Sequence, residues 1–552
     1  MSAPIRFRLA AAALAVLCAA AVHADKKTVC TITVNSPDEK QIFGRNLPTD
    51  GFQFVELVEH GRPDWLASAC RAGVRCDVLL ISGHFDGGDE FYSDRPDVRE
   101  YLPVDEMERA SCSDSCSGLF AQLKEVYLFG CNTLNADAQN VASAEIGRSL
   151  VRSGYSTADA ERLVRALNER HSDSNRDRMR QIFANVPVIY GFSSKAPLGR
   201  TAAPLLDRYF QPGANSEAAA SVGSGRANAK LLGLFAPSSM MVATGLSDTE
   251  PQADTRRDVC RFADDRSSTA RKIDFVHDVL HREMAEVRMF LGQLEKYVAT
   301  LGEADRRMPA VSSALAEIAL DQATRDRYLT FARDADEPAV RVRMLRLAQS
   351  LGWLSTDELH AELVGLMRDR LAQRAIGPGD VDLFCSLNRN GELNAHLHLL
   401  SVREDNVGNA AVRACLGSEK ARARVLRALT SSSDEDVEIA RVYLHHQPIA
   451  EARELRALTM EIARMRGGDA QVRALDALAR YELSDRESLD ALTRLFPLTR
   501  SVAVQRAIAG VLLHADYGAL ERPELSRALR QHRLKSPSGD DLIDLLIRRL
   551  ES

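Results

Sequence analysis

The strongest constraint on the fold is a change in hydrophobic pattern near residue 250. Before it, short continuous apolar runs alternate with stretches of helical spacing. From about residue 267 onward, one stretch of helical spacing follows another and no segment is typical of a strand. Strands that alternate with helices predict a mainly parallel, doubly wound sheet. The 552 residues, too many for a single hydrophobic core, therefore predict an α/β part followed by an all-α part.

The α/β part contains five apolar runs of strand length, at 28–34, 51–57, 77–81, 125–129 and 186–190. Helical spacing separates them at 63–72, 136–184 and 201–209. The runs 77–81 and 125–129 are continuously apolar, which is typical of strands covered on both faces. The stretch 216–224 is rich in Ser, Ala and Gly and predicts a loop or insertion. We expect an α/β domain at 25–245, a linker at 246–266 and a helical domain at 267–552.

The helical part contains a weak internal repeat. Units of similar sequence begin near Asp336, Asn409, Asp434, Gly468 and Thr499. The later starts recur at roughly 25–35 residues, near the range of paired-helix solenoids. An Asp or Asn turn ahead of Val-Arg resembles HEAT-type repeats, and the resemblance implies an extended surface that holds a partner. An irregular helical bundle is the alternative.

The first 24 residues have the pattern of a signal peptide. Arg6 and Arg8 precede the apolar run Leu9–Val22, and small residues up to Ala24 suit cleavage before Asp25. The run is short for a membrane span, although an uncleaved anchor is the alternative. We expect an exported protein, periplasmic or extracellular, without stable membrane insertion. The net charge of -6, with 71 basic and 77 acidic residues closely mixed, argues against nucleic acid as a partner.

Export makes the cysteine count informative. Nine cysteines remain after Cys18 is removed with the signal peptide, so an oxidising compartment leaves at least one thiol outside a disulfide. Cys70 and Cys76, and likewise Cys112 and Cys116, are close enough in sequence to pair, but the pairing cannot be deduced. Zinc bound by Cys112 and Cys116 is an alternative that lacks a second close pair of ligands. We expect no cofactor and no metal.

Two residues with suitable chemistry follow the two most apolar runs. Residues 77–81 lead into Ser82-Gly83-His84, and residues 125–129 lead into Gly130-Cys131. Ligands of doubly wound sheets bind beyond the carboxyl ends of the strands. A thiolate attacks a peptide carbonyl, and a nearby imidazole accepts and returns the proton. Cys131 alone is typical of a small core residue, and His84 alone of a solvated loop residue, but their matched contexts predict one site.

The blocks around both residues resemble caspase-like peptidases of the CHAT type. The segment 79–84 resembles the strand-Ser-Gly-His block of that family, and 126–133 resembles the block that carries its nucleophilic Cys. The segment 186–199 resembles the next strand and its specificity loop. The resemblance covers residues 26–212 and implies a hydrolase with a His84/Cys131 dyad, no metal and a protein or peptide substrate.

One departure from the family concerns the residue after the histidine. Phe85 stands where the family usually has Gly, but its main-chain amide is kept, and with that of Cys131 it is the expected oxyanion donor. The Phe85 side chain must point away from the cleft. Asp86 and Asp89 suit a pocket for basic side chains, whereas Lys195 and Arg200 suit acidic ones. A catalytically inactive relative that acts as a protein-binding scaffold is the alternative function.

Overall fold

The computed structural model describes residues 26–58, 66–85, 88–93, 100–211, 215–372, 376–391, 393, 406–466, 468–516, 522–534 and 542–551. The expected signal peptide, residues 1–24, lies outside the described residues. The chain forms two compact units, Met1–Leu315 and Ala316–Ser552. Each unit is described by itself below.

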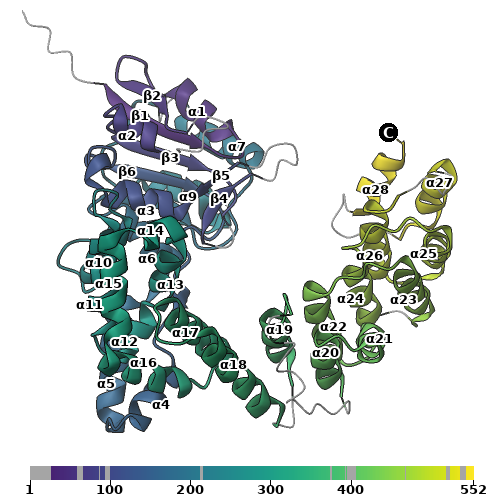
Figure 1. Cartoon of the computed structure of the whole chain (residues 1–552). Helices are drawn as coiled ribbons and strands as arrows, with labels where there is room; N and C mark the ends of the chain where they lie inside the picture. The colour runs from purple at the N-terminus through teal and green to yellow at the C-terminus, as the bar shows by residue number, and fades with distance from the viewer. Residues whose placement is uncertain are drawn as a thin grey trace, which may run out of the picture. The chain divides into compact units, whose positions relative to one another are not determined.

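The first unit contains a six-stranded sheet with the order β10-β9-β6-β3-β1-β2 (Figure 1). The strands are β1 (Lys27–Thr33), β2 (Phe52–Glu56), β3 (Val78–Ser82), β6 (Glu125–Phe129), β9 (Val188–Phe192) and β10 (Met240–Ala243). All neighbours are parallel except β10, which is antiparallel to β9. The five predicted strands are therefore present, within two residues of their expected ends, and the mainly parallel sheet is confirmed.

Alternate residues of the central strands bury their side chains on opposite faces of the sheet. Leu79 and Ile81 of β3 belong to one apolar core, whereas Val78 and Leu80 belong to the other. The first core is closed by helices α2 (Ala67–Arg71), α3 (Val104–Cys112) and α6 (Asn175–Ile182). The second is closed by α1 (Asp38–Asn46), α7 (Gly199–Phe210), α8 (Asn215–Ser221) and α9 (Ala229–Phe235). Burial on both faces explains why β3 and β6 are continuously apolar.

Several short elements of this unit were not predicted. They include β4 (Glu90–Tyr92) with β5 (Tyr101–Pro103), β7 (Ala138–Asn140) with β8 (Asp173–Ser174), β10, α1 and α9. Strands of two to four residues are too short to carry a periodic pattern. The expectation of a loop at 216–224 was wrong, because α8 occupies most of it. Its three consecutive Ala residues favour a helix more than its Ser residues oppose one.

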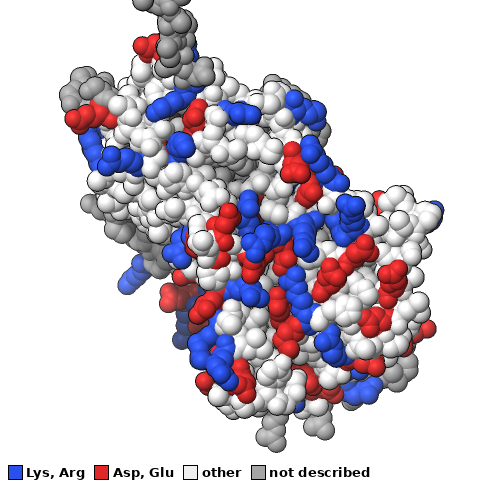
Figure 2. Space-filling view, turned by 90° about the vertical axis from the view of Figure 1, so that its left-hand side faces the viewer, with Lys and Arg blue, Asp and Glu red and all other residues white. Residues whose placement is uncertain are grey.

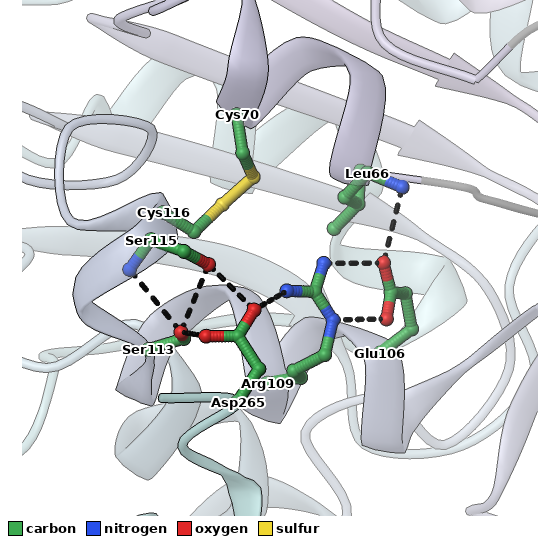
Figure 3. The surroundings of a disulfide bond; sticks show 8 residues. All are labelled: Leu66, Cys70, Glu106, Arg109, Ser113, Ser115, Cys116 and Asp265. Carbon is green, nitrogen blue, oxygen red and sulfur yellow. Dashed lines mark hydrogen bonds and ion pairs between the residues drawn. A yellow bond between two sulfur atoms is a disulfide. The ribbon is translucent and has the colours of Figure 1, made fainter. Parts of the chain in front are cut away.

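The segment expected to be a linker, 246–266, is instead folded onto the first unit. It contains helix α10 (Ala253–Ala263), which packs on α3 and is joined to it by the disulfide Cys112–Cys260. Just beyond the helix, Asp265 accepts hydrogen bonds from the hydroxyls of Ser113 and Ser115, and it pairs with Arg109 at 3.2 Å (Figure 3). These cross-links fix a polar segment that has little apolar surface of its own.

The first unit continues beyond this segment with α11 (Thr269–Leu280), α12 (Met284–Met289), α13 (Leu291–Thr300) and α14 (Glu303–Arg306). The same unit also contains α4 (Ala144–Arg152) and α5 (Thr157–His171), and α12 packs against α5. A buried ion pair joins Arg288 of α12 to Glu145 of α4, with side chains 5% and 4% exposed. The division between the units falls within α15 (Pro309–Leu320), well after the boundary expected near residue 267.

The second unit is helical throughout its described residues. Its helices after α15 are α16 (Gln322–Arg333), α17 (Pro338–Ser350), α18 (Thr356–Leu371), α19 (Pro378–Leu387), α20 (Val407–Cys415), α21 (Glu419–Ala428), α22 (Asp434–His446), α23 (Ala452–Arg464), α24 (Asp469–Leu478), α25 (Arg486–Leu498), α26 (Val502–Leu513), α27 (Arg522–His532) and α28 (Leu542–Glu551). The predicted repeat starts coincide with the beginnings of α17, α20, α22, α24 and α26 within about three residues.

The last helices of this unit stack in two rows. One row runs from α20 through α22, α24 and α26 to α28, and the other from α23 through α25 to α27. Two buried glutamines make equivalent contacts one helix pair apart. Gln471 donates to the carbonyl of Ile462 at 2.9 Å, and Gln505 donates to that of Phe496 at 3.1 Å. Each amide satisfies a carbonyl at the end of the preceding helix, which no intrahelical donor reaches.

We predict that Asp265→Asn lowers the free energy of unfolding by about 1 kcal/mol at pH 7, since it removes charge-assisted hydrogen bonds from a partly exposed group. Burial raises the pKa of Asp265, but hydrogen bonds from Ser113 and Ser115 and the charge of Arg109 outweigh it and lower that pKa below its ordinary 3.8. A lowered folded pKa gives stability above pH 3.8 that is lost as the pH falls through the folded value. Urea unfolding from pH 7 to pH 2.5 should show the difference vanish; a constant difference contradicts it.

We predict that Glu145→Gln destabilises the first unit by about 3–5 kcal/mol, because it leaves the Arg288 guanidinium buried without its counter-charge. Denaturant unfolding followed by circular dichroism measures the change. Glu161→Gln is the matched control, since Glu161 lies exposed on α5, and it should change stability by less than about 0.5 kcal/mol. Equal effects of the two substitutions would refute the prediction.

Candidate active site

His84 and Cys131 follow two neighbouring strands at the same edge of the sheet. The register pairs Ser82 of β3 with Phe129 of β6, the last residue of each strand. The main-chain N–H of Gly83 then donates to the carbonyl of Phe129 at 3.1 Å, so the two chains remain side by side beyond the strands. His84 and Cys131 come two positions after the last registered pair. The structure thus brings both predicted residues to the carboxyl edge of adjacent parallel strands, where ligands of such sheets bind.

A short hairpin, β4–β5, holds His84. Its N–H and carbonyl each exchange a hydrogen bond of 2.9 Å with Tyr92 of β4. The two rings stack with centroids 5.4 Å apart and planes 30° apart. The histidine therefore has both its main chain and its ring oriented by one neighbour. Sequence reasoning missed Tyr92, because a three-residue strand gives no pattern that would connect it to His84.

Cys131 is the only cysteine outside a disulfide among the described residues, and it is half-buried. The amide of Ala196 donates to its sulfur at 3.4 Å. The next residue, Asn132, has a φ of 59° and donates its N–H to the carbonyl of Ser194 at 2.7 Å. Asn tolerates this left-handed conformation better than most residues. The loop 193–198, part of the predicted specificity block, therefore contacts Cys131 and is held beside it.

The two loops approach too closely for any side chain at Gly130. A Cβ built there would lie 2.9 Å from both the carbonyl oxygen of Gly83 and Cβ of Phe85. Phe85 is completely buried, with its ring centroid 4.6 Å from that of Phe91. Its side chain therefore occupies the apolar core rather than the surface beyond the strands. The Phe85 side chain is thus directed into the core, and its main-chain amide lies three residues after the end of β3.

A buried carboxyl group lies below the end of β3. Glu39 of α1 is 2% exposed, and the hydroxyl of Ser82 donates to its Oε2 at 2.9 Å. Burial raises the pKa of Glu39 to about 7, against the opposing effect of its hydrogen bonds. A partly neutral group costs less to bury than a carboxylate. The contact between Ser82 and Glu39 holds the end of β3 against α1. No sequence pattern connected these two residues.

The charged residues proposed to select the substrate are mostly exposed. Asp89 is exposed and lies 3.4 Å from the guanidinium of Arg178, and Asp86 lies outside the described residues. Lys195 and Arg200 are also exposed, on the loop beside Cys131 and at the start of α7. Figure 2 shows basic and acidic side chains mixed over one face of the molecule.

Eight cysteines form four disulfides, Cys30–Cys76, Cys70–Cys116, Cys112–Cys260 and Cys385–Cys415. Cys70 is therefore not bonded to Cys76, and Cys112 is not bonded to Cys116. The zinc alternative is also wrong for Cys112 and Cys116, because a disulfide sulfur is not a thiolate ligand.

Comparisons with protein-family models, with curated proteins and with solved structures found no match to this chain. Among the described helices, none has the length and apolar character needed to cross a bilayer.

The disulfide pattern predicts one reactive thiol per chain. Protein that begins at Asp25, unfolded without reductant, should react with one equivalent of a thiol reagent, located at Cys131 by peptide mapping. The Cys131→Ser variant should react with none. A variant that keeps one reactive thiol, or wild-type protein with none, would contradict this assignment.

Proposed function

We propose that the first unit is a caspase-like cysteine endopeptidase with Cys131 as nucleophile and His84 as general acid and base. The observation that carries the proposal is the position of Cys131. It is the only described cysteine without a disulfide partner, and it follows the strand adjacent to the one that His84 follows. Eight other cysteines in disulfides make this thiol an exception, since a structural cysteine of an oxidised protein is usually bonded.

The proposed reaction begins with transfer of the Cys131 proton to the His84 imidazole. The thiolate attacks the peptide carbonyl carbon, and the resulting oxyanion accepts hydrogen bonds from the amides of Phe85 and Cys131. The imidazolium then protonates the amine as the C–N bond breaks, which leaves an acyl group on the sulfur. Water, deprotonated by His84, hydrolyses that thioester. No metal or cofactor takes part in this scheme.

The amide of Ala196 suits the first step. It donates to the Cys131 sulfur at 3.4 Å, so it is placed to stabilise negative charge that develops there. The same contact places the loop 193–198 beside the nucleophile. We propose that this loop contacts substrate residues next to the cleaved bond. Leu198, which is 48% exposed, Lys195 and Ser194 are its solvent-facing side chains.

The proposed setting is an oxidising compartment outside the cytoplasm, periplasmic or extracellular. Four disulfides support it, because they persist in such compartments. We propose that the helical unit binds a protein substrate or partner through HEAT-like repeats. Its two rows of stacked helices and the equivalent Gln471 and Gln505 contacts support a repeating architecture.

The second candidate function is a protein-binding scaffold without peptidase activity. The stacked helix pairs of the second unit favour it, since such arrays offer long surfaces for partners. It differs from the first in its response to substitution at the site. Binding of a partner by a scaffold would not depend on Cys131 or His84, whereas cleavage requires both.

We predict that wild-type protein cleaves peptides and is labelled at Cys131 by a peptidyl halomethyl ketone under mild reduction. Cys131→Ala should abolish both. His84→Ala should lower kcat/KM by about 10²–10⁴-fold, because the proton transfers lose their carrier. His514→Ala, which changes an exposed histidine of the second unit, is the matched control and should have wild-type activity.

Peptide libraries with mass-spectrometric detection provide the assay between pH 5 and pH 9. Absence of cleavage and of labelling across this range would contradict the peptidase proposal and favour the scaffold. Labelling of wild-type and His84→Ala protein at equal rates would remove His84 from the proposed mechanism while leaving Cys131 as a reactive thiol.

A further inference from the structure

The N-terminal turn of helix α6 contacts both loops of the candidate site. The side-chain amide of Asn175 donates to the carbonyl of Asn132, next to Cys131, at 3.0 Å. One turn later, the guanidinium of Arg178 donates to the carbonyl of Gly88, in the loop after His84, at 2.9 Å. A single rigid element thus holds a carbonyl from each loop. Neither residue lies in the three blocks that carry the resemblance, and neither takes part in the reaction scheme above.

The contact at Asn175 is tightly packed. Asn175 is 3% exposed, and its Oδ1 accepts a hydrogen bond from Gln139 at 3.0 Å. A Cβ built at Gly88 would lie 2.5 Å from that Oδ1, and Gly88 has a φ of +85°. Only glycine adopts this conformation and approach without strain. The loop after His84 therefore rests against the side chain that holds the loop after Cys131.

Arg178 is anchored on its inner side by acidic groups. It lies 3.3 Å from Glu108 and 3.8 Å from Asp105, both on α3, and its own side chain is 14% exposed. Asp173, at β8, lines the same small cavity of about 50 Å³ as Glu108 and Arg178. Its Oδ1 is buried and accepts no hydrogen bond from the described residues.

The charged side chains around Arg178 include more carboxyl groups than basic groups. Burial raises the pKa of Asp173 to about 7 and also raises the pKa of Glu108, in both cases against the opposing charge of Arg178. Removal of the Arg178 charge would leave Lys296, which pairs with Asp105 and also lowers the pKa of Glu108, as the remaining cation beside these carboxyls. The guanidinium is therefore held in place on its inner side, and its outer N–H is held at the Gly88 carbonyl.

We propose that Asn175 and Arg178 are positioning residues, which fix the distance between His84 and Cys131 by holding the carbonyls of Gly88 and Asn132 on one helix. The inference rests on the proposed function, because the alignment matters only if the two side chains react together. Neither residue touches the reacting atoms in this scheme. Loss of either contact would let one loop move against the other, and a displacement of about 1 Å at a reacting pair lowers the rate by about 100-fold.

The test compares three variants with a matched control in the full chain. Asn175→Asp replaces the donor to Asn132 by an acceptor and keeps the shape, and an acidic residue is tolerated in the first turn of a helix. Arg178→Lys keeps the charge but has no planar fork. Gly88→Ala separates the His84 loop from Asn175 without changing any charge. Arg180→Lys is the control, because Arg180 lies on the same helix but bonds Thr244 and Glu250 instead.

The expected result is a kcat about 100-fold below wild type for Asn175→Asp and Gly88→Ala, with KM nearly unchanged. Arg178→Lys should lose less, since it retains part of the contact, and the control should match wild type. Alkylation of Cys131 by iodoacetamide should slow by about tenfold in the same two variants, since the imidazole no longer meets the thiol. A fold defect in either variant would instead lower the kcat and the free energy of unfolding of that variant together, while the control keeps both.

One result would overturn the inference, and it can be told apart from failure of the proposed function. If Asn175→Asp and Gly88→Ala fold and keep kcat and alkylation rates equal to those of the control, α6 does not position the pair. If wild-type protein cleaves nothing, and His84→Ala alkylates as fast as wild type, then the dyad itself is wrong. If Arg178→Lys does not fold, the other two variants decide.

Discussion

The pairing of β3 with β6 in a parallel sheet is the constraint on which the candidate site depends. Parallel neighbours end at the same edge, so residues that follow Ser82 and Phe129 are brought together without any direct interaction between their side chains. Burial of both strands on both faces makes this pairing hard to shift, because a slip by one residue would exchange the two cores. The loops add precision to a placement that the sheet already imposes.

The disulfides divide the cysteines into two chemical classes. Cys30–Cys76 joins β1 to the segment just before β3, and Cys112–Cys260 joins α3 to α10. These bonds lie within or beside the core, away from the strand ends that His84 and Cys131 follow. Cys131 stands apart because its sulfur is met by an amide rather than by another sulfur. Structural cross-linking and a reactive thiol therefore coexist in one unit.

The sequence predicted the parts of the fold that carry long or strongly apolar patterns. The strands β3 and β6 were predicted because burial on both faces leaves a continuous apolar run, and their ends placed His84 and Cys131. Sequence reasoning missed α10 because Ala253 is its only buried residue. Its position depends on a disulfide to Cys112, which is distant in the chain, and on Asp265, which lies just beyond the helix. The disulfide pairing was not deducible, since it depends on which elements become neighbours.

The contacts that hold the two loops were equally out of reach of sequence reasoning. Tyr92, Asn175 and Arg178 come from a three-residue strand and from the start of a short helix, and their partners are main-chain carbonyls, which every residue possesses. No local pattern distinguishes an Asn that meets such a carbonyl from one that faces solvent. Such contacts become visible only when the loops have been placed in space.

The most direct test of the central claim is a crystal structure of the chain with a peptide aldehyde bound. We expect a hemithioacetal on the Cys131 sulfur, with its oxygen about 2.7–3.1 Å from the amides of Phe85 and Cys131 and the His84 ring beside it. An adduct at another residue, or a Cys131 adduct with His84 turned away from it, would contradict the proposed dyad.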